Sequence, residues 1–413
     1  MRVLWFSITP SLFNPKSTSF NGGGWIASLE QIVRKIPEIY LGVAFMFPNS
    51  DFKYEKDGVT YYTIQPQHLG LLQRIRGKKP SYSSDFHRII EDFKPDLIQI
   101  FGSENHFGEI CNLTQIPTVI HMQGSLPPYH NALFPPGINT YDFLFTGGLK
   151  PMRRYVGLRS NRAFRKNAEM EIRTLQSCKN FMGRTEWDKN VVKLHNPDAR
   201  YFHCEEALRD SFMNSGKQWN PHRNGGKFRI ISVSSSPWYK GADLILKTAK
   251  LLKQFGNLDF EWDVYGVNEV AFFEHKFDIK AEEVNVNIKG VASKDQLVEA
   301  LINSDCYVHA SYIDNSPNSL CEAQYLGVPV LATFVGGIPS MVKDGEDGIL
   351  FPANDPYTLA SLLKQIAEDN ELAKSLSEKA RKRAIERHNP EAIGQTLLSI
   401  YKDILSCSHC SSR

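Results

Sequence analysis

Short apolar runs alternate with amphipathic stretches along this chain, and this alternation limits the folds that are open to it. The strands predicted from apolar runs in the first half are Arg2–Ile8, Leu41–Phe47, Leu97–Phe101 and Thr118–Met122. The helices predicted from apolar periodicity are Trp25–Lys35, Asp85–Phe93 and Asn161–Leu175. Alternating strands and helices indicate βαβ units, whose strands pair side by side in a parallel sheet.

A polar interruption separates two such halves. Few apolar runs occur between Tyr201 and Gly226, so we expect a domain boundary or a long connection there. Beyond it the predicted strands are Phe228–Val233, Trp262–Tyr265, Val284–Ile288 and Val328–Ala332. The predicted helices are Ala242–Lys253, Lys294–Ile302, Asn318–Leu326, Pro356–Glu368, Leu372–Glu386 and Pro390–Leu405. The pattern predicts an α/β fold with two doubly wound halves that face each other across a cleft.

Length and composition narrow the class of protein. The 413 residues suggest two or three domains at roughly 100–200 residues each. A net charge of +3 gives no reason to expect nucleic acid as a partner. No apolar run reaches the ~18–20 residues of a membrane span. Seven scattered cysteines, an odd number, are typical of reduced thiols in a cytoplasm.

The C-terminal Cys407, His409 and Cys410 are too few to complete a metal site. We therefore predict a disordered tail there.

Parallel sheets of this kind bind ligands beyond the carboxyl ends of their strands, so the loops after strands are the places to look for chemistry. Gly22, Gly23 and Gly24 follow the first predicted strand and precede a helix, where a phosphate can approach the backbone closely. The alternative is a tight helix entry. Lys240 follows the first strand of the second half and offers a compact cation for phosphate, or is a solvated surface lysine.

The segment from Asp314 to Thr333 combines several features of a ligand site. A helix is predicted to start at Pro317, and the first backbone N–H groups of a helix bind anions. Glu322, one turn further in, is predicted to be buried and can accept hydrogen bonds from sugar hydroxyls. The alternatives are that Asp314 is only a turn residue and Glu322 only a surface helix residue.

His121 and Arg184 are further candidates. His121 ends a predicted strand and is either a ligand contact or a buried core histidine. Arg184 follows the strand-like run at Asn180–Met182 and can bind a diphosphate, unless Thr185 merely caps the next helix and Arg184 is exposed. The sequence contains no dinucleotide fingerprint, zinc-protease motif, paired C-x-x-C, hydrolase elbow or D-x-D motif. Lys240, Arg184 and helix N-termini would therefore have to balance a diphosphate.

The blocks DNSPNSLCEAQYLGVPVLAT and GGIPSMVKDGEDGILFPANDP resemble the donor-binding signature of retaining glycosyltransferases of the GT-B fold, family 4, which carries an E-x7-E motif. The preceding segments also occur in the order expected for this family, namely the glycine loop, His121, GRTEWD and WYKG. The chain is similar to bacterial members that build capsule, O-antigen or exopolysaccharide. The resemblance implies two Rossmann-like domains, residues 1–203 on the acceptor side and 204–388 for the nucleotide sugar. It also implies that residues 389–413 form a helix crossing back to the first domain, plus a tail.

The resemblance also implies roles for individual residues. Glu322 would bind the ribose, Asp314 and His121 the donor sugar, and Lys240 the leaving phosphate. The donor diphosphate would be held by the helix start and by the glycine loop, comprising Ser316, Asn318, Ser319, Leu320, Gly22, Gly23 and Gly24. Two positions depart from the family. Asp314 stands where the family has glutamate, and Ser235 stands where it usually has an arginine, for which Arg184 would substitute.

The expected function is transfer of a sugar, with retention, from a UDP- or GDP-sugar to a glycan or polyprenyl-linked acceptor, with no metal and no other cofactor. The leaving phosphate would take the acceptor proton. Alternatives are a sugar-nucleotide epimerase or hydrolase on the same fold, and a non-catalytic nucleotide-sugar-binding protein. A dehydrogenase is disfavoured because the dinucleotide fingerprint is absent. The choice of base would depend on the Gly266 and Gly290–Val291 loops.

Two basic clusters suggest contact with an anionic membrane. They lie beside the apolar Leu69–Leu72 and the aromatic Gly124–Phe145 and comprise Arg74, Arg76, Lys78, Lys79, Lys150, Arg153, Arg154, Arg159, Arg162, Arg165 and Lys166. Basic residues near such a surface contribute about 1 kcal/mol each. We expect a cytoplasmic protein that contacts the inner face of the membrane through these residues. The alternative is that they form a solvated basic helix face.

Overall fold

We describe a computed structural model of the chain. The structure describes residues 1–13, 24–48, 51–67, 80–139, 141–142, 151–221, 226–234, 238–268 and 270–410, and the side chains of 151–161 and 408–410 lie outside this description. Some of the predicted residues therefore lie outside the described residues, namely Gly22, Gly23, Ser235, the basic cluster at Arg74–Lys79 and Lys150.

The first half of the chain forms an eight-stranded sheet with the order β3-β4-β2-β1-β5-β6-β7-β8. All pairs are parallel except β3 with β4. Its strands are β1 (Arg2–Ser7), β2 (Tyr40–Met46), β3 (Lys53–Lys56), β4 (Val59–Ile64), β5 (Leu97–Phe101), β6 (Thr118–His121), β7 (Asn180–Gly183) and β8 (Arg200–His203). The helices of this half are α1 (Gly24–Val33), α3 (Ser83–Phe93), η2 (His106–Glu109), α4 (Ile110–Leu113), α5 (Leu126–Asn131), α7 (Pro151–Ser177) and α8 (Glu186–His195), and the short α9 (Asp210–Met213) follows in the connection to the second half.

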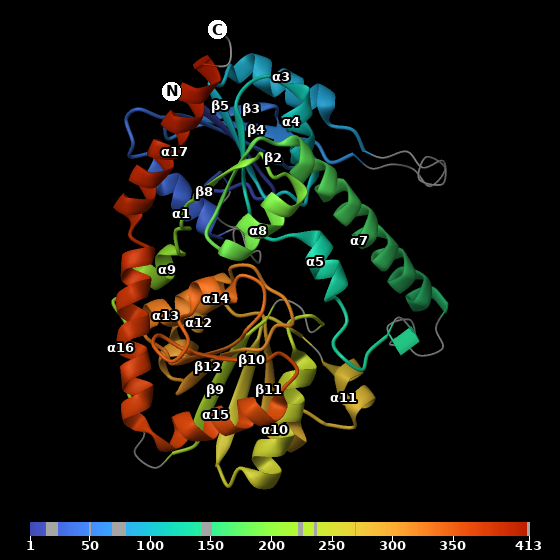
Figure 1. Ribbon diagram of the computed structural model, residues 1–413, viewed down its shortest axis with the longest axis vertical. Helices are drawn as coiled ribbons and strands as arrows, with labels where there is room; N and C mark the ends of the chain where they lie inside the picture. Colours follow the sequence, from blue (N-terminus) through green and yellow to red (C-terminus); the bar gives the residue numbers. More distant parts are fainter. Residues whose placement is uncertain are drawn as a thin grey trace.

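The second half forms a six-stranded parallel sheet with the order β11-β10-β9-β12-β13-β14. Its strands are β9 (Phe228–Val233), β10 (Phe260–Tyr265), β11 (Val286–Gly290), β12 (Cys306–His309), β13 (Val330–Thr333) and β14 (Ile349–Phe351). The helices are α10 (Ala242–Phe255), α11 (Ala271–Phe277), η3 (Glu282–Val284), α12 (Lys294–Ile302), α13 (Asn318–Leu326), α14 (Ile338–Met341), α15 (Pro356–Glu368), α16 (Asn370–Arg387) and α17 (Pro390–Cys410). The prediction of two doubly wound α/β halves is confirmed (Figure 1).

Each sheet has its own apolar core because apolar strands must be covered on both faces. Two clusters cover the faces of the first sheet, and one cluster surrounds the second. Cys204 and Ala207 pack in the first half, whereas Leu208 and Phe212 pack in the second. The chain therefore passes from one core to the other within a few residues.

The chain crosses back at its C-terminal end, as predicted. α16 runs beside the second domain and α17 beside the first, and Figure 1 shows the two helices in red along one side of the molecule. Ile393 and Leu397 of α17 belong to the first core, and the hydroxyl of Tyr401 accepts a hydrogen bond of 3.1 Å from Trp5 Nε1. The two crossings touch, because His388 Nδ1 lies 2.8 Å from the carbonyl oxygen of Glu206.

Several predicted elements need correction. α17 continues to Cys410, so the prediction of a disordered tail from Cys407 is wrong up to that residue. The predicted strand Val284–Ile288 begins later, because η3 occupies Glu282–Val284 and Asn285 has a positive φ of 59°. Strands β3, β4, β8, β12 and β14 were missed, most of them being short or at a sheet edge. Within the described chain, no helix is both long and apolar enough to cross a bilayer.

Candidate functional site

α13 starts at the carboxyl end of β12, where the second sheet faces the first domain. Pro317 is its N-cap and supplies no side-chain hydrogen bond to the helix start. The first N–H groups of a helix have no partner inside the helix, and the macrodipole adds partial positive charge there. Ser316, Pro317, Asn318 and Ser319 line a cavity at this end. The helix start thus presents backbone donors to a space large enough for a ligand.

Lys240 lies in the turn between β9 and α10, and its ammonium group pairs with the Asp314 carboxylate at the cavity wall. Oδ2 of Asp314 lies 2.8 Å from Nε2 of His309. Burial by itself raises the pKa of Asp314, but the charge of Lys240 and the hydrogen bond with His309 outweigh it and hold this pKa below its usual range. Asp314 therefore stays a carboxylate and fixes the direction of the ammonium group.

Glycine at 241 makes this turn possible. Its φ of +77° is left-handed, and a Cβ there would lie 2.0 Å from the carbonyl oxygen of Ala310. The start of α10 can therefore pack against the end of β12 only without a side chain at this position. This close approach brings Lys240 beside Asp314.

Glu322 is buried, with 1% of its surface exposed, as predicted. The guanidinium group of Arg209 binds both of its oxygens, with Nε–Oε1 at 2.5 Å and Nη2–Oε2 at 2.6 Å. Burial raises the pKa of Glu322, and the charge of Arg209 acts in the opposite direction. Both members of the pair line the cavity.

One cavity of about 290 Å³ collects these groups. It is lined from the second domain by Lys240, the start of α13, Glu322 and the loops after β10 and β11, and from the first domain by Gly24, Trp25 and Gln123. Glu206 and Arg209, on the connection between the domains, also line it. Of the predicted site residues, Gly24, Ser316, Asn318, Ser319, Glu322 and Lys240 line this cavity. Gly266 and Val291, predicted to influence the base, line it too.

Arg184 lies behind the cavity rather than in its lining. It is 2% exposed, and Nη2 donates to the Ser316 carbonyl at 2.6 Å and to Asn318 Oδ1 at 2.8 Å. The same nitrogen is 3.2 Å from Glu206 Oε2. Thr185 caps α8 by accepting a hydrogen bond of 3.1 Å from the Asp188 N–H, so the predicted capping role is confirmed, but Arg184 is not exposed. Arg184 supports the loop that leads into α13.

His121 also lies outside the cavity lining. It is fully buried, in ring contact with Trp25 and Phe101 at 5.0 and 6.0 Å. Among the described residues neither ring nitrogen has a hydrogen-bond partner. Burial, followed by the charge of Arg184, lowers the pKa of His121 to about 3. The ring is therefore neutral, and its contact with a donor sugar stays a prediction.

The two domains meet at the loop before α13. Asn315 Nδ2 donates to Asp188 Oδ2 at 3.1 Å and Thr185 Oγ1 donates to Asn315 Oδ1 at 2.6 Å. The Tyr129 hydroxyl accepts from the Asn315 N–H at 3.1 Å, and its ring stacks on Tyr239 at 5.5 Å. Polar contacts of this kind are typical of interfaces between domains that move relative to each other.

Reasoning from the sequence missed three residues of this site. Arg209 and Glu206 lie in the polar connection predicted to be a domain boundary, and His309 ends β12, a strand that the sequence did not predict. Burial raises the pKa of Glu206 to about 7, although Arg184 opposes it. The sequence signal that was available is the charged run EEALRD inside the interdomain connection.

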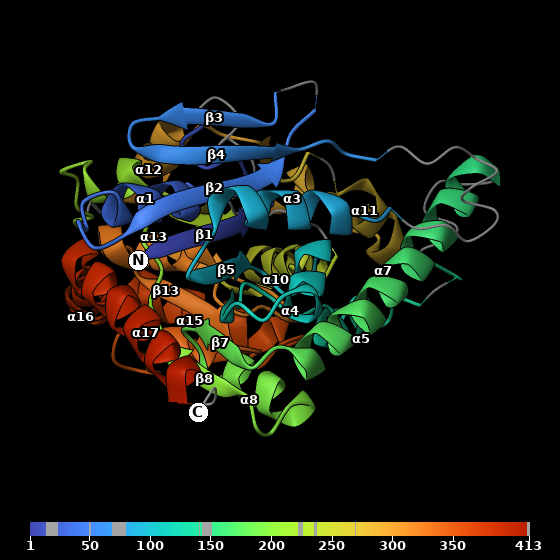
Figure 2. The same cartoon turned by 90° about the horizontal axis from the view of Figure 1, so that it is seen from above.

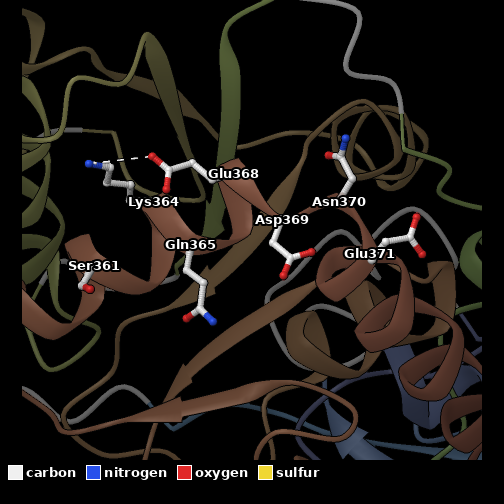
Figure 3. A pocket seen from close by; sticks show the side chains of 7 residues that line it. All are labelled: Ser361, Lys364, Gln365, Glu368, Asp369, Asn370 and Glu371. Carbon is white, nitrogen blue, oxygen red and sulfur yellow. Dashed lines mark ion pairs between the residues drawn. The ribbon is translucent and has the colours of Figure 1, made fainter.

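A second hollow lies far from these groups, where α15 meets α16. It is lined by Ser361, Lys364, Gln365, Glu368, Asp369, Asn370 and Glu371. Figure 3 shows that these side chains point in different directions, with an ion pair of 3.7 Å between Lys364 and Glu368. The hollow takes all of its lining from two consecutive helices and has no contribution from the first domain, so it is not the candidate site.

The comparisons with known proteins bear on the second half of the chain and on the fold. The family described as glycosyl transferases group 1 matches residues 216–383, which contain Lys240, Asp314 and Glu322. A relative, the colanic acid biosynthesis glycosyltransferase candidate WcaL of Salmonella typhimurium, is 25% identical over 191 residues, which are 44% of this chain and 46% of WcaL. The matches span less than half of the length of the first curated relatives.

Solved structures match nearly the whole chain. Sucrose-phosphate synthase from Thermosynechococcus elongatus aligns with a TM-score of 0.70 and 13% identity, over 98% of this chain and 99% of that one. Anabaena HepE, solved with UDP and glucose, aligns with a TM-score of 0.64 and 14% identity, over 97% and 99%. At such identities the likeness shows the fold alone. Residues 216–383 thus match the family of glycosyl transferases group 1, and the chain that carries them has the two-domain GT-B fold.

Proposed function

We propose that this protein is a retaining glycosyltransferase that moves a sugar from a UDP- or GDP-sugar to a glycan or lipid-linked glycan acceptor in bacterial surface polysaccharide synthesis. The observation that carries the proposal is the single cavity that joins Lys240, the start of α13 and Glu322 to Gly24 of the other domain. The name of WcaL, in colanic acid biosynthesis, and the UDP bound by HepE support the same class of reaction.

The diphosphate, the ribose and the base of a nucleotide sugar would each have a counterpart in the cavity wall. The diphosphate would lie at the start of α13, near Ser316, Asn318, Ser319 and the backbone of Leu320, with Lys240 as its cation. The ribose would reach Glu322, and the base would lie between the Gly266 and Val291 loops. Asp314 would act on the donor mainly by holding Lys240, with His121 behind the sugar.

In the proposed reaction the anomeric C–O bond to phosphate breaks while the acceptor oxygen bonds to the same face of that carbon. The acceptor proton passes to the departing phosphate oxygen, so the products are a nucleoside diphosphate and a glycoside. The protein would contribute by positioning both substrates and by stabilising charge on the diphosphate. No metal or other cofactor is required in this scheme, and we expect transfer to continue in excess EDTA.

Lys240→Ala tests the proposal. Loss of the cation is expected to lower turnover by about 100-fold. Lys247→Ala is the matched control, because Lys247 pairs with Asp243 on the same α10 helix outside the cavity lining. Near-normal transfer by Lys240→Ala would remove this residue from the site.

Ligand binding separates the rival functions. Calorimetry with UDP, GDP, ADP and NAD should show binding of a nucleoside diphosphate and none of NAD. Release of nucleoside diphosphate that depends on added acceptor indicates a transferase, acceptor-independent release a hydrolase, and isomerised donor an epimerase. Binding without any turnover would indicate a non-catalytic binding protein and would overturn the proposed activity.

We further propose cytoplasmic location with peripheral contact to anionic lipid through α7. This long helix projects from the body of the first domain (Figure 2). Arg162, Arg165 and Lys166, on its described part, are exposed. Sedimentation with anionic vesicles at low salt should carry the protein down and neutral vesicles should not. Absence of co-sedimentation with the anionic vesicles would end this part of the proposal.

A further inference from the structure

Arg209 lies on the connection between the two domains, and its side chain reaches the cavity wall. It is the N-cap residue of α9, two positions after Ala207, the last residue of this connection in the first core. Its guanidinium group lies in the cavity wall and holds both oxygens of Glu322, at 2.5 and 2.6 Å. The partner carboxylate comes from α13 of the second domain. Arg209 is thus the cation nearest to the carboxylate proposed to meet the ribose.

Both domains fix the Arg209 side chain. A Cβ on Gly24 would lie 2.8 Å from Cδ and 2.9 Å from Cγ of Arg209, so the first residue of α1 leaves space for its stem. The guanidinium carbon lies 4.7 Å from the ring centre of Phe212. The stem of Arg209 therefore lies beside α1, and its planar guanidinium, in contact with Phe212 and Glu322, presents its two donors in a fixed direction.

This geometry leaves part of Glu322 available to a ligand. A carboxylate has about four lone-pair sites, and a bidentate guanidinium uses one on each oxygen. One lone pair on each oxygen therefore remains, which matches the two neighbouring hydroxyl donors of a ribose. We propose that Arg209 is the positioning residue that makes Glu322 a receptor for the vicinal 2′,3′-diol of a ribonucleotide. This inference rests on the proposed function, because it deepens the role of the same cavity.

Arg209 also affects the charge of this receptor. Burial raises the pKa of Glu322, while Arg209, Lys294 and Arg184 act to lower it. Burial and nearby negative charges, including that of Glu322, raise the pKa of Tyr307 far above the neutral range, so Tyr307 stays neutral. Removing Arg209 takes away the strongest opposing charge, so the pKa of Glu322 rises further. A protonated carboxyl has lost an acceptor position and binds the diol less well.

The test compares the binding of ribose and 2′-deoxyribose nucleotides by calorimetry. UDP and GDP are used, each with its 2′-deoxy counterpart, on the full chain at pH 6.5 and pH 8.5. The variants are Arg209→Gln and Arg209→Lys, which keeps the charge but cannot bridge both oxygens. Arg381→Gln is the matched control, because Arg381 contacts the Tyr325 carbonyl of the same α13 outside the cavity lining.

The wild type and Arg381→Gln are expected to prefer the ribose form by about tenfold or more, since the lost contact is to a charged group. Arg209→Gln should lose most of this preference, and the loss should be greater at pH 6.5 than at pH 8.5, because a raised pKa of Glu322 favours the protonated carboxyl at the lower pH. The ribose preference of Arg209→Lys should lie between those of the wild type and Arg209→Gln.

Full preference in both Arg209 variants at both pH values would overturn the inference while leaving the proposed function intact. If Arg209→Gln fails to fold, full preference in Arg209→Lys is sufficient to overturn it. If the wild type binds neither UDP nor GDP, the proposed function fails together with the inference.

Discussion

At the scale of single residues, two buried carboxyl groups near the cavity differ in charge for different physical reasons. Asp314 has an ammonium group and His309 as partners, so its pKa lies below the usual range despite burial. Glu206 is 2% exposed with Arg184 at 3.2 Å, and burial outweighs this partner and raises the pKa of Glu206 to about 7. The first carboxylate is permanent near neutral pH, whereas the second titrates there.

The titration of Glu206 predicts a pH dependence of nucleotide binding. Above about pH 7 the ionised carboxylate faces the cavity and repels an anionic diphosphate, so affinity should fall as the pH rises. Calorimetry between pH 6 and 8.5 should show a weaker fall for Glu206→Gln than for the wild type. Glu205→Gln is the control, since Glu205 does not line the cavity and its pKa lies below its usual value. Equal pH profiles in all three proteins would contradict the role of Glu206.

At the scale of elements, the start of α10 and the start of α13 come together because the backbone at Gly241 packs directly on β12. The carbonyl of Ala310 leaves no room for a side chain there. Hydrogen bonds connect β12 to the start of α13: Tyr307 donates to Ser319 Oγ at 2.9 Å, and its oxygen lies 3.1 Å from His309 Nδ1. His309 also contacts Asp314, the partner of Lys240, so the end of α13 proposed to bind phosphate is linked to the Lys240 turn.

Gly241→Ala tests this packing. Left-handed backbone strain alone costs about 1–2 kcal/mol, and the clash with Ala310 adds to it. Gly345→Ala is the matched control, because Gly345 has a similar φ of +73° but open space around the added Cβ. Urea denaturation should therefore show a larger loss of unfolding free energy for Gly241→Ala, and the proposed transferase activity should fall further in this variant. Equal losses of unfolding free energy in both variants would show that the contact with β12 is not tight.

At the scale of the whole molecule, the domains are joined by two chain crossings that touch each other. The first crossing carries Glu206 and Arg209, and the second carries His388 at the end of α16. α17 then packs against the first core, where the hydroxyl of Tyr401 hydrogen-bonds to both Trp5 and Gln99. The C-terminal helix thus stabilises the domain that is most distant from it in sequence.

Tyr401→Phe should destabilise the first domain without affecting the cavity. It leaves the buried Trp5 donor and Gln99 acceptor without this partner, at a cost of about 1–3 kcal/mol. Thermal unfolding should show a lower Tm, with nucleotide affinity unchanged. Lys402→Ala, a substitution at the exposed neighbouring position, should leave the Tm near that of the wild type. A Tyr401→Phe protein with an unchanged Tm would mean that α17 contributes little.

The periodicity of apolar residues was sufficient for the two sheets and for the long helices, because strand and helix burial impose different spacings on the chain. Short strands such as β12 and polar edge strands such as β3 carry too few apolar residues to show that spacing. The helix start at Pro317 and the burial of Glu322 were also visible in the sequence, since both depend on residues close together in the chain.

The sequence by itself determined the two doubly wound halves, the anion-ready start of α13 and the positions of Lys240 and Glu322 after or near strands. Only the tertiary structure decided which side chain meets which. Arg209 reaches Glu322 across 113 positions of sequence, and Arg184 turns behind the cavity toward the Ser316 carbonyl. The physical reason is that local spacing fixes the face on which a side chain emerges, whereas its partner depends on how distant segments pack.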